Sequence, residues 1–282
     1  MSQVTVFSEV ECELGEGPTY DPASDRLFWF DIRGHRLLEQ ASHSHETTVH
    51  ELPLAASALA VIDAERQLLA TEKGLYVREV STGRLSLLAA IEEEKAHTRS
   101  NDSRVHPSGA FWMGTMGKSS EPRAGAIYWH FRGETRLLYP DVSIPNSICF
   151  SWDGSVAYFA DSARGDIMRV ACDLVSGLPA GEPQVFRHRS LAPGEPDGSI
   201  VDEDGVLWNA RWAASRLDAY APDGQLLRSI DLPARQVTCP AFIGARADRI
   251  AVTSAWQAYD AKARAEDPNA GKTFLLDLPV KG

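Results

Sequence analysis

The stretch that decides the fold runs from Asp197 to Trp208 and reads Asp-Gly-Ser-Ile-Val-Asp-Glu-Asp-Gly-Val-Leu-Trp. It opens with a polar residue, followed by a short apolar run, an Asp-x-x-Gly turn and a second run that ends in an aromatic residue. Short apolar runs separated by Asp, Asn, Gly and Pro turns are typical of antiparallel strands. The stretch therefore predicts the first two strands of a small sheet.

Units of the same form recur at intervals of roughly forty to fifty residues, the length of one four-stranded propeller blade. The six units begin at Glu16, Ser57, Asn101, Asn146, Asp197 and, in degenerate form, Cys239. The sequence predicts an all-β fold, a six-bladed β-propeller with four-stranded blades around a central metal site, as a single domain over residues 1–282. Residues 3–7 are expected to close the ring by pairing with the strand around residues 274–278. An irregular β-sandwich is the alternative fold.

The composition excludes several classes of partner. The 282 residues include 28 Lys and Arg against 39 Asp and Glu, a formal charge of −11 at pH 7. Such an acidic chain is unsuited to a phosphate backbone, so no nucleic-acid partner is expected. Neither a membrane-spanning run nor a secretory signal is visible, so we expect a cytoplasmic protein without a membrane partner. A monomer and a weak homo-oligomer both remain open.

Four of the units open with a carboxylate or carboxamide side chain. The innermost strand of each propeller blade lines the central channel, so Glu16, Asn101, Asn146 and Asp197 are expected to converge near the axis. Two carboxylates and two carboxamides are hard oxygen donors, which favour Ca²⁺, Mg²⁺ or Mn²⁺. For any single residue the alternative is a turn cap, because Asn and Asp side chains commonly bond to nearby backbone.

Several motifs carry a resemblance to a known family along nearly the whole chain. They are Gly15-Glu16-Gly17-Pro18, Arg99-x-Asn101-Asp102 with a following Pro-x-Gly, Trp112-x-Gly-Thr-Met116, and the segments that contain Asn146 and Asp197. With these motifs the chain resembles the senescence marker protein/gluconolactonase/luciferin-regenerating enzyme family, also called regucalcin-like. Ser147 departs from the family pattern, in which glycine commonly follows the asparagine.

The resemblance implies a ligand set and a set of substrate contacts. Glu16, Asn146 and Asp197 would bind one divalent metal ion, with Ca²⁺ as the first choice and Zn²⁺, Mg²⁺, Mn²⁺ or Fe²⁺ as alternatives. Arg99, Asn101 and Glu121 fall where family members contact the substrate. Asp102 is expected to steady its neighbours, although a turn role fits it equally well.

The family's usual reaction is the opening of sugar lactones to aldonic acids, and these residues suit it. The metal ion would act as a Lewis acid on the lactone carbonyl, and Asp197 would be the general base for the attacking water. The expected partner is a small-molecule sugar lactone. Two alternatives remain, a phosphotriesterase or arylesterase propeller and a calcium-binding propeller without catalysis.

Overall fold

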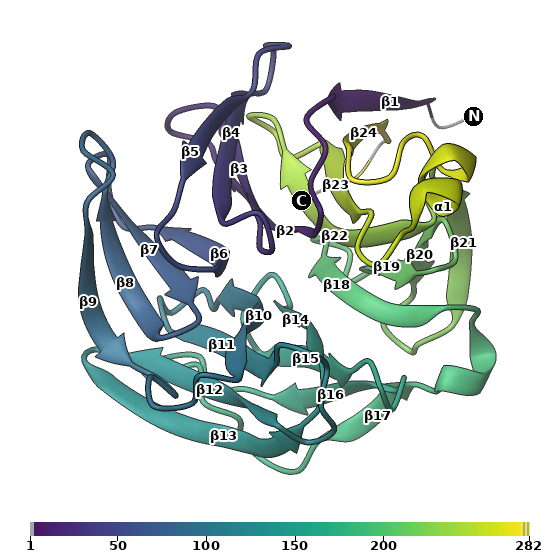
Figure 1. The fold of residues 1–282 in the computed structure, drawn as a ribbon. Helices are drawn as coiled ribbons and strands as arrows, with labels where there is room; N and C mark the ends of the chain where they lie inside the picture. Colours follow the sequence, from purple (N-terminus) through teal and green to yellow (C-terminus); the bar gives the residue numbers. More distant parts are fainter. Residues whose placement is uncertain (1–2, 279, 281) are drawn as a thin grey trace.

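Each repeated unit folds into an antiparallel sheet of four strands, and the six sheets form a ring (Figure 1). The computed structural model describes residues 3–278, 280 and 282. From the axis outward, blade 1 is β2 (Gly15–Asp21), β3 (Arg26–Asp31), β4 (Arg36–Ala41), β5 (Thr48–Glu51); blade 2 is β6 (Ala56–Val61), β7 (Arg66–Thr71), β8 (Gly74–Glu79), β9 (Leu85–Ala90); blade 3 is β10 (Thr98–Val105), β11 (Phe111–Gly117), β12 (Gly125–Phe131), β13 (Glu134–Val142). Blade 4 is β14 (Pro145–Phe150), β15 (Val156–Asp161), β16 (Ile167–Ala171), β17 (Gln184–Arg187); blade 5 is β18 (Glu195–Val201), β19 (Leu207–Trp212), β20 (Arg216–Tyr220), β21 (Leu226–Asp231); blade 6 is β22 (Gln236–Ile243), β23 (Arg249–Ala255), β24 (Thr273–Asp277), β1 (Gln3–Ser8). The predicted six-bladed propeller is confirmed, and the β-sandwich is excluded.

The ring closes through a sheet that contains both ends of the described chain. β1 is the outermost strand of blade 6 and pairs antiparallel with β24, with Gln3 opposite Asp277 and Val6 opposite Phe274. The pairing predicted for residues 3–7 is therefore confirmed. Because backbone hydrogen bonds join the two ends of the chain, the last blade cannot form without the first strand.

Hydrophobic cores lie between neighbouring blades. Leu68 and Leu75 of blade 2 pack in one buried cluster with Phe111 and Met113 of blade 3. Fully burying a side chain of this size contributes about 1.5–3 kcal/mol. The aromatic and aliphatic residues that mark the repeat thus hold adjacent blades together, so the centre of the ring is free to contain polar groups.

Helical structure in the described chain is confined to α1 (Ala261–Glu266) and a 3₁₀ turn, Arg189–Leu191. The Asp260 carboxylate caps α1 by accepting a hydrogen bond from Ala263 N at 2.8 Å. No helix of the described residues has the length and apolar character needed to cross a membrane.

The innermost strands share a local irregularity that decides where the polar residues point. Each of β2, β6, β10, β14, β18 and β22 shifts register against the second strand of its blade. In β2 the shift follows Glu16, in β14 it follows Asn146, and in β18 it follows Pro196. Because a β-bulge turns side chains away from the regular alternation, it can direct these residues along the channel.

Candidate active site

The predicted polar residues gather at one end of the central channel. A cavity of about 340 Å³ is lined by five of them, Glu16, Arg99, Asn101, Asn146 and Asp197. They come from the innermost strands of blades 1, 3, 4 and 5 and are separated by as many as 181 positions in sequence (197 − 16). Only the propeller topology brings them to one place.

The two carboxylates of the cavity are buried next to each other. Glu16 and Asp197 are 3% and 5% exposed and lie close enough to interact electrostatically. Burial, and then the negative charge of Asp102, raises the pKa of Glu16 to about 8, although the Gly17 amide partly opposes this shift. Burial and the charge of Glu16 raise the pKa of Asp197 well above its ordinary value. The pair therefore needs a positive charge or a shared proton to be stable in this position.

A chain of hydrogen bonds fixes the two carboxamides. Arg99 Nη1 donates to Asn101 Oδ1 at 2.8 Å, and Asn101 Nδ2 donates to Asn146 Oδ1 at 3.0 Å. Asn146 Nδ2 in turn donates to Ser162 Oγ at 2.8 Å, and Ser162 Oγ donates to the Pro196 carbonyl at 2.6 Å. Because the Asn146 amide nitrogen is held by Ser162, its oxygen is the atom that remains for a ligand in the cavity.

Arg99 is the cation of the site. Burial lowers the pKa of its guanidinium to about 10, and the charges of Glu16 and Asp197 act in the opposite direction. The side chain therefore stays protonated at neutral pH. When both carboxylates are ionised, one positive charge faces two negative charges, and a bound cation would balance the difference.

Asp102 lies beside the cavity without lining it. Its Oδ2 accepts a hydrogen bond from Ile148 N at 2.7 Å, and its Oδ1 is buried with no partner. This bond joins β10 to the bulge that follows Asn146 in β14. The contact agrees with a role in positioning the neighbours of Asp102, which stays a prediction.

Glu121 is not among the described residues that line the cavity. Its Oε2 accepts a hydrogen bond from Ser119 N at 3.1 Å, so the carboxylate is turned back on its own loop. Ser120 from the same loop does line the cavity. The substrate contact expected for Glu121 stays a prediction and requires its carboxylate to leave Ser119.

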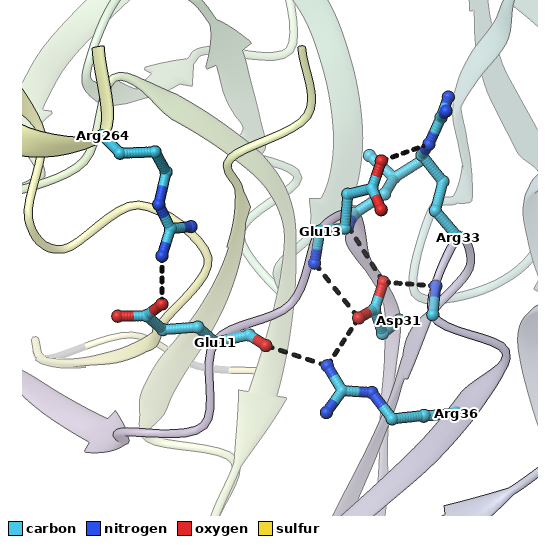
Figure 2. Close-up of polar contacts among 8 residues, drawn as sticks. Glu11, Glu13, Asp31, Arg33, Arg36 and Arg264 are labelled. Carbon is cyan, nitrogen blue, oxygen red and sulfur yellow. Dashed lines mark hydrogen bonds and ion pairs between the residues drawn. The ribbon is translucent and has the colours of Figure 1, made fainter. Parts of the chain in front are cut away.

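The loop that leads into β2 is fastened by Asp31, the last residue of β3 (Figure 2). The buried Asp31 carboxylate accepts hydrogen bonds from Glu13 N at 3.1 Å and Leu14 N at 3.0 Å, and forms a 2.6 Å ion pair with Arg36. Leu14 itself lines the cavity, two residues before Glu16. Asp31 thus fixes the backbone from which Glu16 enters the site.

The same network extends to the last blade, and blade 4 uses a similar contact. Arg36 donates to the Glu11 carbonyl at 2.9 Å, while the Glu11 side chain pairs with Arg264 of α1 (Figure 2). In blade 4, Asp161 at the end of β15 accepts hydrogen bonds from Ser143 N and Ile144 N, each at 3.0 Å. Two of the predicted ligands, Glu16 and Asn146, therefore follow loops that are held by an aspartate.

Sequence reasoning missed other residues of the cavity. Ser120, Ser162, Trp212 and Gln257 also line it. Ser162 directly follows β15, and Trp212 is the last residue of β19. No motif distinguishes them from structural residues, so the only signal is their position in the repeat.

The chemistry of the donor set fits a hard divalent cation. Glu16, Asn146 and Asp197 offer oxygen donors, and the raised pKa of the two buried carboxyls means that a nearby cation would be needed to keep both ionised. In the described part of the chain, no group of three or more His, Cys, Asp or Glu side chains could hold a metal ion. The set that fits a hard divalent cation instead combines carboxylate and carboxamide oxygens.

These features define a class of protein, a six-bladed propeller with an oxygen-lined polar cavity at one end of its channel. Residues 14–256 match the family model described as the SMP-30/Gluconolactonase/LRE-like region. The chain belongs to this family, which confirms the resemblance carried by its motifs.

Individual relatives match over nearly their full length. A Rhizobium meliloti (strain 1021) protein named "Putative sugar lactone lactonase" is 50% identical over 98% of this chain and 94% of its own. The L-arabinolactonase of Azospirillum brasilense is 34% identical over 99% and 93%. A crystal structure of a calcium-binding protein, regucalcin, from Agrobacterium tumefaciens superposes with a TM-score of 0.98 at 45% identity, over 100% of this chain and 95% of that one.

Proposed function

We propose that this protein opens sugar lactones to aldonic acids and that Glu16, Asn146 and Asp197 hold a divalent cation for the reaction. The observation that carries the proposal is the convergence of oxygen donors from blades 1, 4 and 5 in one buried cavity. Relatives that match along nearly the whole chain are named as lactonases, among them the L-arabinolactonase. Ca²⁺ is the first choice because the donors are hard oxygens, and the regucalcin relative is described as calcium-binding.

A cation bound there would polarise the lactone carbonyl and stabilise the negative charge that develops on its oxygen. Asp197 takes a proton from the attacking water as the carbon–oxygen bond to water forms. The ring carbon–oxygen bond then breaks, and the ring oxygen leaves as a hydroxyl by taking the proton that Asp197 removed from water. The product is an open-chain aldonic acid with one water added.

The remaining polar residues orient the sugar. Arg99 uses Nη1 for Asn101 and the Ser100 carbonyl, so its other donors are available for hydroxyl groups in the cavity. Asn101 Nδ2 donates its hydrogens to the Pro145 carbonyl and to Asn146 Oδ1. The main role of Asn101 is therefore to hold the Asn146 side chain in place. Glu121 contributes in this proposal only after its carboxylate has swung away from Ser119.

A metal and substrate panel tests the proposal. Protein stripped with a chelator is given Ca²⁺, Mg²⁺, Mn²⁺, Zn²⁺ or Fe²⁺, and acid release is followed from glucono-, galactono-, xylono- and arabinonolactone. We expect hydrolysis of at least one lactone that depends on added metal. Absence of turnover on all four would contradict lactonase activity, and turnover unaffected by the chelator would contradict the cation.

The same panel separates the alternatives. Paraoxon and phenyl acetate, added as further substrates, identify a phosphotriesterase or an arylesterase if they turn over faster than every lactone. Calcium binding measured by calorimetry, without turnover of any substrate, identifies a calcium-binding propeller without catalysis. Glu16→Gln is expected to weaken calcium binding in either case, because it removes a charged ligand.

A further inference from the structure

A second cavity, of about 520 Å³, lies at the opposite end of the central channel. The same innermost strands line both cavities. β2 contributes Glu16 to the candidate active site and Thr19 to the second cavity, and β14 contributes Asn146 and Phe150 in the same way. These strands surround the axis in Figure 1. We call the second cavity the far-face cavity.

Arg104, at the base of the far-face cavity, makes only long hydrogen bonds to oxygen. Arg104 follows Asn101 by three residues on β10, a distance of about 10 Å along the strand. Its Nη1 lies 3.4 Å from the Pro18 carbonyl, and its Nη2 lies 3.3 Å from the Ser199 carbonyl and 3.5 Å from Cys239 Sγ. The two bonds to oxygen are longer than the usual 2.7–3.2 Å for N–H···O, and Nε is buried with no partner.

The charge of Arg104 is also incompletely paired. Asp102 attracts it electrostatically, but no carboxylate in the described part of the chain forms an ion pair with it within 4.0 Å. Asp102 directs its Oδ2 to Ile148 N instead. Arg104 is partly accessible, and it is the only charged side chain among the described residues that line the far-face cavity.

The walls of the far-face cavity are mostly apolar. Phe150, Ile200 and Phe242 are among the residues that line it. Trp152 also lines the cavity and is 62% exposed, which is unusual for so large an apolar side chain. The volume lies within the roughly 300–1,000 Å³ that is typical of small-molecule pockets. A single cation at the base of an apolar pocket is the arrangement that recognises an anion with an apolar body.

We propose that the far-face cavity binds a small monocarboxylate with an apolar body, with the carboxylate on Arg104 and the body against Phe150 and Phe242. A monoanion is favoured because one guanidinium can balance one negative charge, whereas a doubly charged phosphate would be left with an uncompensated charge in an apolar pocket. The proposal does not depend on lactone hydrolysis, because the cavity shares no lining residue with the candidate active site among those described.

Calorimetric titration of the full-length protein with benzoate tests the proposal. Benzamide, a neutral molecule of the same shape, and acetate, which lacks the apolar body, are the matched ligands. We expect saturable benzoate binding that is at least about ten-fold tighter than the binding of benzamide, which lacks the charged hydrogen bond to Arg104, or of acetate, which lacks the apolar contacts. Equal binding of benzoate and benzamide, or no benzoate binding at about 10 mM, where even a weak site is populated, would overturn the proposal.

Variants locate the binding site. Arg104→Met is expected to weaken benzoate binding at least about ten-fold, and Arg104→Lys to retain most of it. Arg78→Met is the matched control, because Arg78 is a buried arginine outside the cavity and is bonded to Gln67. Unchanged affinity in the Arg104→Met protein would contradict the assignment.

Two further variants keep the proposal testable if Arg104→Met does not fold. Trp152→Ala removes an exposed wall residue and is expected to weaken benzoate binding without loss of the folded state. Asp197→Asn alters the other cavity and is expected to leave benzoate affinity unchanged. Loss of benzoate binding in Asp197→Asn, or none in Trp152→Ala, would place the ligand elsewhere and overturn the proposal.

Discussion

Blades 1, 3, 4 and 5 differ from blades 2 and 6 at one position of the same strand. The first group presents Glu16, Asn101, Asn146 and Asp197 to the cavity. In blade 2 the position holds Ser57, whose Oγ donates to the Asn101 carbonyl at 2.6 Å. In blade 6 the register shift of β22 puts Thr238 at this position, one residue before the Cys239 expected from the sequence, and its Oγ1 donates to the Gly15 carbonyl at 2.6 Å.

The difference teaches that position in the repeat does not by itself make a ligand. Ser57 and Thr238 are buried to 1% and 0% exposure, and their short hydroxyls bond to the backbone of a neighbouring blade. The longer carboxylates and carboxamides extend into the cavity. Side-chain length thus decides whether a blade contributes to the chemistry or to the cohesion of the ring.

The strongest test of the comparison is Asp197→Asn. We expect the rate of lactone hydrolysis to fall by about 10³-fold or more, since a general base alone contributes 10²–10⁴-fold. The metal-free variant should nevertheless unfold at a higher temperature than the wild type, because one of two adjacent buried carboxylates becomes neutral.

Asp202→Asn is the matched control, because Asp202 is an equally buried aspartate of blade 5 whose carboxylate accepts a hydrogen bond from Trp208 Nε1 at 3.0 Å. It should lose stability and keep activity, and the reverse pattern would contradict the site.

Asp31→Ala tests the loop that carries a ligand. Asp31 is bonded to Glu13 N, Leu14 N and Arg36, so its removal should lower the free energy of unfolding by about 3 kcal/mol. The corresponding loop of blade 2 is held less firmly, by a 3.2 Å hydrogen bond from Ala55 N to Glu72 Oε1. Glu72→Ala should cost about 1 kcal/mol. Urea unfolding measures both, and equal losses would contradict the difference between the blades.

Ser57→Ala tests the blades that lack a ligand. Loss of the hydrogen bonds to the Asn101 carbonyl and to Ser100 Oγ should reduce the free energy of unfolding by about 1 kcal/mol. The hydrolytic rate should stay within about two-fold of the wild type, since no group of the reaction is removed. Thr238→Val should behave alike. A rate loss comparable to that of Asp197→Asn would show that blades 2 and 6 take part in the chemistry.

Ser147→Gly is expected to show the smallest change in the free energy of unfolding. The Ser147 φ of 58° lies in the left-handed region, and the Ser147 Oγ donates to the Asp197 carbonyl at 2.6 Å. Ser147→Ala keeps the backbone strain and loses the hydrogen bond to the Asp197 carbonyl, so we expect the free energy of unfolding to fall by about 1 kcal/mol. Ser147→Gly relieves a strain of about 1 kcal/mol as it loses the bond, so the two effects should nearly cancel. If the alanine variant is as stable as the glycine variant in urea, this account of Ser147 is wrong.

Much of the fold follows from the sequence because every blade needs turn residues between its strands and apolar residues within them, and these residues form the repeat. An Asp-x-x-Gly turn or a variant of it joins the first two strands of each unit, and the apolar second strand that follows, as at Val206 to Trp208, packs against a neighbouring blade. The pairing of β1 with β24 also follows, since residues 3–7 alternate and lie outside the units. The compact and charged segment Ile91 to His97 has helical propensity but forms turns, with Glu92 at a φ of 54°, because local composition does not decide where a connection between blades turns.

The site was predictable only to the extent that it lies on the innermost strands. Glu16, Asn101, Asn146 and Asp197 occupy one position of the repeat, and the bulges direct them to one cavity. Loop residues have no such constraint, so the turn of Glu121 back to Ser119 and the bond from Asn146 to Ser162 had no signal in the sequence. Their placement depends on tertiary contacts that a repeat does not encode.

The pairing of β1 with β24 has a consequence for the synthesis of this protein. β1 can pair with β24 only when Asp277 has emerged from the ribosome, so blades 1 to 5 are synthesised before blade 6 is complete. Until that moment the edges of the unfinished ring can pair with other nascent chains or be cut by proteases. Removal of either strand would leave blade 6 incomplete and its edge exposed.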